Sequence, residues 1–216
     1  MHIRPLPASL SRSLRTASIV GACLLGIGLP AMAAPEPDPV PTRWQLYVET
    51  SPLSLINLQD DRGNVHPYFY MTYEVTNDSG QDLVFAPVFE LADDEGRTVR
   101  GGRGVPGSVT RRLMDMLENP LLQDQVSVLG LLLQGNDNAR QGLVIWPAED
   151  LNVDNISIFC AGFSGETETV NFPTRNGAER SVLFRKTLML SFDTPGTLVP
   201  GRTPDMRPAE TRWVMR

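Results

Sequence analysis

Short runs in which apolar and polar residues alternate predict a chain built mainly from β-strands. The clearest run is residues 68–76, where one face carries Phe69, Met71, Tyr73 and Val75. A period of two residues is the pattern of a strand that buries one of its faces. Residues 77–80, Asn-Asp-Ser-Gly, suit the positive φ of a tight turn, so a hairpin is expected there. Its returning strand would be residues 83–91, with Pro87 at a bulge or a sheet edge.

Comparable runs recur along the chain, at residues 44–48, 53–58, 143–146, 155–161 and 180–192. Segments rich in Asn, Asp and Gly, such as 61–64 and 93–96, separate several of them. Short strands separated by such turns predict an antiparallel two-sheet sandwich, because α/β layering needs a helix between successive strands. Residues 126–133 are apolar and fit either a strand or a short helix.

Residues 108–118 form a segment with helical spacing. Its apolar face carries Val109, Leu113, Met116 and Leu117. Ser108 or Thr110 would cap the first turn through its side-chain oxygen, and Pro120 would stop the helix. One short helix is therefore expected to be inserted in the sandwich.

Residues 1–33 have the composition of a cleavable signal peptide. Three Arg and no acid lie in the first fifteen residues, and residues 16–29 carry no charge. Ala31-Met32-Ala33 then supplies the small residues that a signal peptidase needs. The uncharged run is shorter than the roughly 20 residues of a membrane span. We expect cleavage after Ala33 and export to the periplasm or the exterior. Alternatively, residues 20–23 resemble a lipoprotein box, in which Cys23 would be acylated and anchor the protein.

Proline content divides the rest of the chain into three parts. Residues 34–42 are a Pro-rich spacer, expected to be stiff and unable to pack. Residues 43–194 would form the sandwich. Residues 195–216 are again Pro-rich and would run over the surface as a tail, unless Trp213 and its apolar neighbours dock on the domain.

Charge and cysteine content narrow the classes of function. Residues 1–33 hold three of the 19 basic residues and none of the 25 acids, so their removal leaves 16 basic residues and a net charge of −9. Nucleic acid is therefore an unfavourable partner. Cys160 is then the one remaining cysteine, which excludes an internal disulfide, and it shares a strand face with Ile156 and Ile158. We expect a buried core thiol. The first fifteen residues lack an Arg-Arg pair, which argues against twin-arginine export and against a cofactor loaded beforehand.

The order of turns and strands resembles a known family. Residues 73–80 and 89–96 each end an alternating strand in an Asn- or Asp-rich turn closed by Gly, and 133–135 and 142–146 add a Gly pair before a late strand. This pattern, over roughly residues 44–162, resembles an exported bacterial immunoglobulin-like module. The resemblance implies a binding or accessory module and names no active site. The helix expected at 108–118 departs from the family pattern.

A glycine-rich segment, residues 102–107, matches the G-x-G-x-x-G spacing of dinucleotide-binding proteins. That site needs a parallel βαβ unit, whereas antiparallel hairpins are expected before this segment, and Pro106 removes a loop amide. A weaker possibility is an anion site, since helix N-termini attract anions. The basic residues that flank the loop are Arg100, Arg103, Arg111 and Arg112. They are candidates for binding a small anion or an acidic polymer.

Aromatic residues offer a second candidate site. Tyr68 and Tyr70 lie on the clearest strand and would form an exposed strip on which a sugar could stack. His66, the one histidine beyond residue 33, lies in an expected turn, so no His-rich metal site can form. Carboxylates that folding brings together could still hydrolyse a glycosidic bond.

The sequence thus predicts a non-catalytic exported module of the cell envelope that binds an envelope protein or a polysaccharide, with no cofactor and no bound metal. A carbohydrate-binding module that uses surface aromatics is one alternative. A hydrolase with carboxylates assembled by the fold is another. The oligomeric state stays open.

Overall fold

The fold is taken from a computed structural model that describes residues 35–173 and 178–216, all within the compact unit Ala34–Arg216. The predicted signal peptide and the alternative acylation site at Cys23 lie outside the described residues. Within those described ranges, no helix is both long enough and apolar enough to cross a lipid bilayer.

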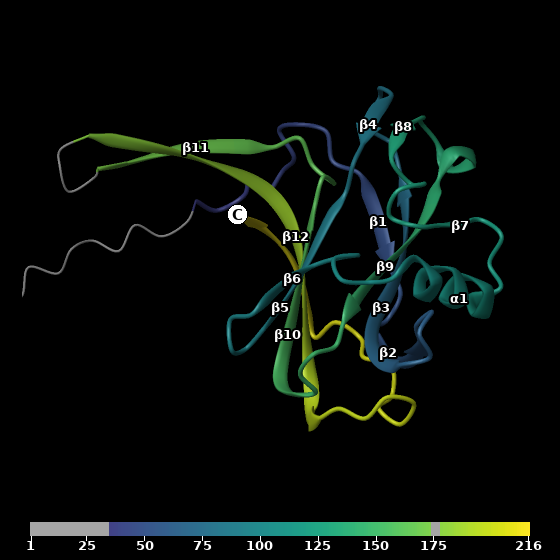
Figure 1. The fold of residues 1–216 in the computed structure, drawn as a ribbon. Helices are drawn as coiled ribbons and strands as arrows, with labels where there is room; N and C mark the ends of the chain where they lie inside the picture. Colours follow the sequence, from purple (N-terminus) through teal and green to yellow (C-terminus); the bar gives the residue numbers. More distant parts are fainter. Residues whose placement is uncertain (1–34, 174–177) are drawn as a thin grey trace, which may run out of the picture. The chain divides into compact units, whose positions relative to one another are not determined.

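The described residues form a mainly β structure with one short α-helix, as the alternation predicts (Figure 1). The elements are, in chain order, β1 (Tyr47–Thr50), β2 (Ser54–Gln59), β3 (Val65–Thr76), β4 (Leu83–Phe85), β5 (Val88–Asp93), β6 (Thr98–Arg100), α1 (Gly107–Leu117), β7 (Leu122–Gln123), β8 (Gly130–Leu132), the 3-10 turn η1 (Asn136–Asn138), β9 (Arg140–Pro147), β10 (Asn152–Ala161), β11 (Thr167–Pro173), β12 (Glu179–Thr197) and β13 (Glu210–Met215).

The first sheet has the order β1-β3-β9-β7, with β2 on the same edge of β3 as β1. A break at Ser51-Pro52 separates β1 from β2. Proline has no N–H for the ladder, and there the Ser51 hydroxyl accepts the Thr72 N–H at 3.0 Å. Tyr73 pairs with Gly142 of β9, and its ring occupies the space that a Cβ would fill.

The second sheet has the order β11-β12-β10-β5-β6, and β13 pairs with a later part of β12 than β11 does. β12 is long enough to form a hairpin with β11 and also to pair within the core of the second sheet. Its residues 179–185 form a hairpin with β11, and its later residues pair with β13 on one side and β10 on the other.

The inner faces of the two sheets share one apolar core, which gives the antiparallel sandwich expected from the sequence. β3 contributes Phe69, Met71, Tyr73 and Val75, the face that the alternation predicted. Four aromatic rings meet in this core, with Phe163 at centroid distances of 5.4–5.9 Å from Phe85, Phe89 and Tyr73. Cys160 is 1% exposed and belongs to the same core, as predicted.

Helix α1 covers the outer face of the first sheet. Val109 and Leu113 of the helix pack on side chains of β2, β3, β7 and β9, namely Leu58, Tyr68, Leu122, Leu143 and Ile145. The position of the helix agrees with the sequence, but the expected cap is wrong. Pro106 occupies the N-cap and no side chain caps the first turn, while Glu118 ends the helix in the left-handed region with φ 49°.

The segment 77–91 differs from its prediction as a hairpin return. The chain splits at Pro87 into β4, which pairs with β8, and β5, which pairs with β10 in the second sheet. Asn77 explains the departure from β3, because its fully buried side chain donates to the carbonyls of Gln81 and Leu132. The turn therefore directs the chain toward β8.

Both Pro-rich segments pack on the domain. The expectation that residues 34–42 cannot pack is wrong, because the Asp38 N–H and C=O bond to the side chains of Glu166 and Lys186. In the C-terminal segment, β13 pairs with β12, and Met206 forms an isolated antiparallel β-bridge with Leu53. Trp213 lies against the core, so residues 210–216 dock as the alternative expected.

Candidate functional site

The exposed aromatic strip expected at Tyr68 and Tyr70 does not form. Tyr68 is 3% exposed and Tyr70 is half-buried, since both lie on the face of β3 that α1 covers. Burial is also the main cause of the raised pKa of Tyr68. The sequence shows an amphipathic helix and an apolar strand face, but their packing against each other is a tertiary contact.

The four arginines around the glycine loop are all exposed, but they do not converge on one hollow. Arg100 ends β6 and Arg103 lies in the following turn, whereas Arg112 lies on the helix. Arg111 is the one of the four that lines the hollow between the loop and the helix, and Asp124 lines the same hollow. Backbone N–H groups of Ser127 and Val126 bond to Asp124 and, against the effect of burial, hold the pKa of this carboxyl below its usual value. An anion in this hollow would therefore meet a carboxylate.

His66 lies beside a shallow hollow at the start of β3. Its Nε2 is 3.9 Å from Oδ2 of Asp60, and Gly104, Pro106 and Glu149 line the same hollow. Among the described residues, the walls of this hollow hold no serine, cysteine or lysine side chain that the histidine could activate. His66 is the turn histidine that the sequence indicated.

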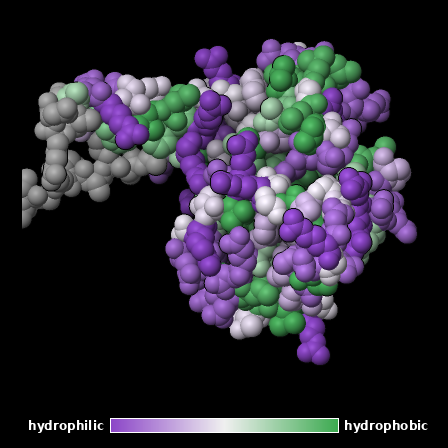
Figure 2. Space-filling model, viewed as in Figure 1, coloured by the Kyte–Doolittle hydropathy of each residue, from purple (hydrophilic) through white to green (hydrophobic). Residues whose placement is uncertain are grey.

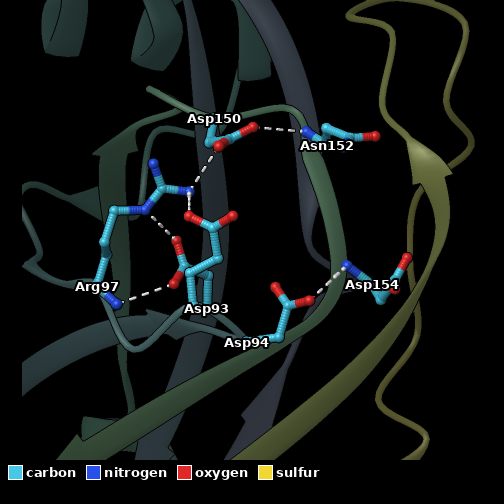
Figure 3. Close-up of polar contacts among 7 residues, drawn as sticks. Asp93, Asp94, Arg97, Asp150, Asn152 and Asp154 are labelled. Atoms are coloured by element: carbon cyan, nitrogen blue, oxygen red, sulfur yellow. Dashed lines mark hydrogen bonds and ion pairs between the residues drawn. The ribbon is translucent and has the colours of Figure 1, made fainter.

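Two acids of the 93–95 turn, Asp93 and Glu95, contact Arg97, whereas Asp94 lies toward Asp154 (Figure 3). Arg97 bonds through Nε to Asp93 at 2.8 Å and through Nη2 to Asp150 at 2.7 Å, with Glu95 at 3.5 Å. The Asn152 N–H and the Arg97 guanidinium lower the pKa of Asp150. These contacts join the β5–β6 turn to the β9–β10 connection above a small apolar hollow lined by Phe69, Leu91, Val99 and Ile156.

The carboxylates around Arg97 connect the β5–β6 turn to the β9–β10 connection. Three carboxylates already face Arg97, and Asp94 accepts the Asp154 N–H at 3.3 Å. Among the residues that the structure describes, no group of three or more His, Cys, Asp or Glu could hold a metal ion. The arrangement links two loops and offers no free pair of carboxylates.

The strongest candidate site is the outer face of the β4–β8 ribbon, where apolar side chains are exposed. Val84 and Leu131 lie directly opposite each other and are 77% and 53% exposed, while the neighbouring pair Leu83 and Leu132 is buried. Leu129 and Leu133 extend this face and are 47% and 43% exposed. Figure 2 shows the resulting apolar surface over β4 and β8, at the top of the view. We call Val84, Leu129, Leu131 and Leu133 the ribbon face.

Polar side chains hold the ribbon in place so that these residues point outward. Arg140 donates from Nη1 to the Val128 carbonyl and from Nη2 to the Leu131 carbonyl, each at 2.6 Å. Asn77 ties the end of β8 to the turn after β3 through the Leu132 carbonyl at 3.0 Å. Within the described chain, β4 and β8 pair only with each other. Because Arg140 already occupies the Leu131 carbonyl of β8, the outer edge of β4 is the edge open to a further strand.

Sequence reasoning missed this surface because residues 126–133 are mostly apolar. Such a run indicates burial, and the alternation at 129–133 is visible only once Leu132 is known to point inward. Comparison of the chain with family models, with curated proteins and with solved structures gave no match. The candidate site therefore rests on geometry alone.

Proposed function

We propose that this chain is a non-catalytic exported accessory module of the cell envelope that binds another protein through the ribbon face. The observation that carries the proposal is the exposure of paired, rigidly held apolar side chains, with Val84 77% exposed opposite Leu131. Contiguous apolar surface of this kind marks interaction sites in folded proteins. The partner would present an apolar, extended segment that covers the four side chains and pairs with a free edge of the ribbon.

Magnitudes support a binding role of moderate affinity. Full burial of one Val or Leu side chain contributes about 1.5–3 kcal/mol, and these four side chains are only partly exposed. Association costs several kcal/mol in lost translational and rotational freedom. The ribbon face would therefore serve as the anchor of a larger contact, to which strand pairing adds hydrogen bonds and orientation.

The two alternatives have less support. The carbohydrate-binding alternative relied on an aromatic platform, and Tyr68 is 3% exposed beneath α1. The hydrolase alternative relied on free carboxylates, and Asp93, Glu95 and Asp150 all contact Arg97. A second pair, Glu49 and Glu74, lies on opposing strands beside a hollow, but these carboxylates accept hydrogen bonds from Tyr47 and Gln141. The resemblance to immunoglobulin-like modules agrees with the proposal, since such β-sandwiches commonly bind other proteins.

Site-specific photo-crosslinking in cells tests the proposal. A photoreactive amino acid at Leu131 should crosslink to one envelope protein, whereas the same group at Thr98, exposed on β6, should not. Val84→Asp should abolish the adduct from position 131 and leave the melting temperature unchanged, because Val84 is 77% exposed. Equal adducts from positions 98 and 131, or an adduct that survives Val84→Asp, would contradict it.

A further inference from the structure

A two-stranded arm extends from the second sheet. Residues 167–173 of β11 pair with residues 179–185 of β12, and this arm runs well beyond the strands that pack in the core (Figure 1). Each strand of the arm has the same alternation of exposed and half-buried residues, and none of the arm's described residues is buried. The arm therefore adds nothing to the core of its own domain.

One face of the arm is apolar at its centre and charged at two corners. Its cross-strand pairs, from the root outward, are Glu168 with Phe184, Val170 with Val182, and Phe172 with Arg180. The apolar side chains are half-buried, and the two charged residues are exposed. The rings of Phe172 and Phe184 lie 6.4 Å apart although they belong to the two outer pairs, so they lean together across the valines. We call this surface the arm face.

The opposite face of the arm is mainly polar, with Thr, Asn and Ser side chains beside Leu183. Glu179 and Arg185 also lie on this second face, because they alternate with the arm-face residues along β12. The arm is thus amphipathic without a core beneath it. An isolated two-stranded hairpin is marginally stable in water, so an apolar face of this kind calls for a partner surface.

The root of the arm is held firmly. Arg185 exchanges two backbone hydrogen bonds with Arg216, at 2.8 and 3.1 Å. The Arg216 guanidinium is 2.7 Å from Glu90 and lies over the ring of Phe159. Next to it, the buried Lys186 bonds to Glu166 at 2.8 Å, where β11 begins. These contacts fix the root of the arm to the domain, while no described residue of the arm itself is buried.

We propose that the arm face binds the arm face of a second copy of this chain. The charge pattern identifies the occupant, because Glu168 and Arg180 stand at diagonally opposite corners of the arm face. When the two arms cross at about a right angle, a two-fold axis that lies between them at about 45° to each arm brings Glu168 of each copy near Arg180 of the other. The same operation places valines on valines and each phenylalanine on its equivalent. The arm face is therefore self-complementary: opposite charges meet at its corners, and apolar side chains meet at its centre.

The resulting dimer is independent of the ribbon face, which belongs to a different ribbon of the sandwich. Two crossed arms bury less surface than a standard protein interface, which places this contact among the small, transient ones. Dimerisation would give the molecule two ribbon faces, which raises the apparent affinity for a partner that presents repeated sites.

Analytical ultracentrifugation of charge-reversed variants tests the arm contact. The protein is expressed from the full-length sequence and purified as the cell processes it. Glu168→Arg and Arg180→Glu should each raise the dimer dissociation constant at least about tenfold, because two ion pairs become two repulsions. An equimolar mixture of the two variants should form a heterodimer as tight as the original dimer, because both contacts are then Arg with Glu.

Matched controls make the same charge changes on the opposite face. Glu179→Arg and Arg185→Glu should leave the dissociation constant within about twofold of the unmodified protein. All four variants should melt at the same temperature as that protein, because none of these side chains lies in the core. A protein that stays monomeric at every concentration would overturn the proposal. So would controls that weaken the dimer equally, or a mixture that fails to restore it; the last result would indicate an arm bound to another surface, such as the ribbon face.

Discussion

The Nζ atom of Lys186 lies 2.8 Å from Oε2 of Glu166, and the two side chains are only 2% and 9% exposed. Lys186 is the single lysine in a chain of 216 residues whose other basic side chains are arginines. A compact ammonium fits this place, since it donates to the Glu166 carboxylate and to the Asp38 carbonyl, at 3.0 Å, and lies over the Trp213 ring. The pair joins the root of the arm to both Pro-rich segments.

Loss of one partner of this pair should be costly, and loss of both should cost much less. Lys186→Met leaves a buried carboxylate without its cation and should lower the free energy of unfolding by about 3–5 kcal/mol. The double variant Lys186→Met/Glu166→Leu should recover most of that loss, because a buried ion pair is often no more stabilising than apolar side chains of similar size. Urea unfolding of the two single variants and the double variant measures the coupling. Additive effects would show that the pair is not a unit.

Acid should weaken this contact at a predictable pH. Burial alone would raise the pKa of Glu166, but the Lys186 ammonium and the Asp38 N–H outweigh it and hold the pKa below its ordinary value of 4.5. A lowered pKa in the folded state contributes stability above the unfolded-state pKa, and this contribution is lost as the pH falls through the folded-state pKa. Glu166→Gln should therefore be less stable at neutral pH, and its difference from the unmodified protein should shrink below about pH 4.5. Unfolding midpoints from acid to neutral pH provide the measurement, and a constant difference would contradict the prediction.

Gly142 should tolerate no side chain. Its Cβ position is taken by the ring of Tyr73, the residue that it pairs with across β3 and β9. Gly142→Ala should lower the free energy of unfolding by about 1–3 kcal/mol, the usual cost of overpacking a core. Gly80→Ala is an informative comparison, because nothing lies within 4 Å of its Cβ position and its cost would come from a φ of +85° alone. Thermal unfolding followed by circular dichroism measures both, and a fully stable Gly142→Ala protein would show that the sheet can shift.

Glu118 should be improved by glycine. It is the one non-glycine residue with positive φ in the part of the chain that the structure describes, and it ends α1 at φ 49°. Glycine adopts this conformation without a clash of its own, so Glu118→Gly should raise the free energy of unfolding by about 0.5–1 kcal/mol. Glu118→Ala serves as the control for loss of the charge and should give no gain. Equal gains from both variants would point to charge as the cause.

Local pattern was sufficient for much of the fold. Alternation located β3 with the correct inward residues, and the i, i+4 spacing of Val109 and Leu113 located α1. Cys160 was placed in the core from its strand neighbours alone. These features depend on the period of a single segment, which the chain carries in its own order of residues.

Contacts between distant segments decided the rest. Tyr68 is buried because α1, some forty residues later, packs on its strand. In the apolar segment around Leu131, Val128 and Leu132 point inward, and this leaves Leu131 exposed. The arm face arises because β12 is longer than the part of it that pairs with β10 and β13, and its first residues pair with β11 alone. The sequence by itself therefore determined which segments are strands or helix and which of their faces are apolar. Only the tertiary structure decided which apolar faces cover one another, because burial depends on the neighbours that folding brings together across the chain.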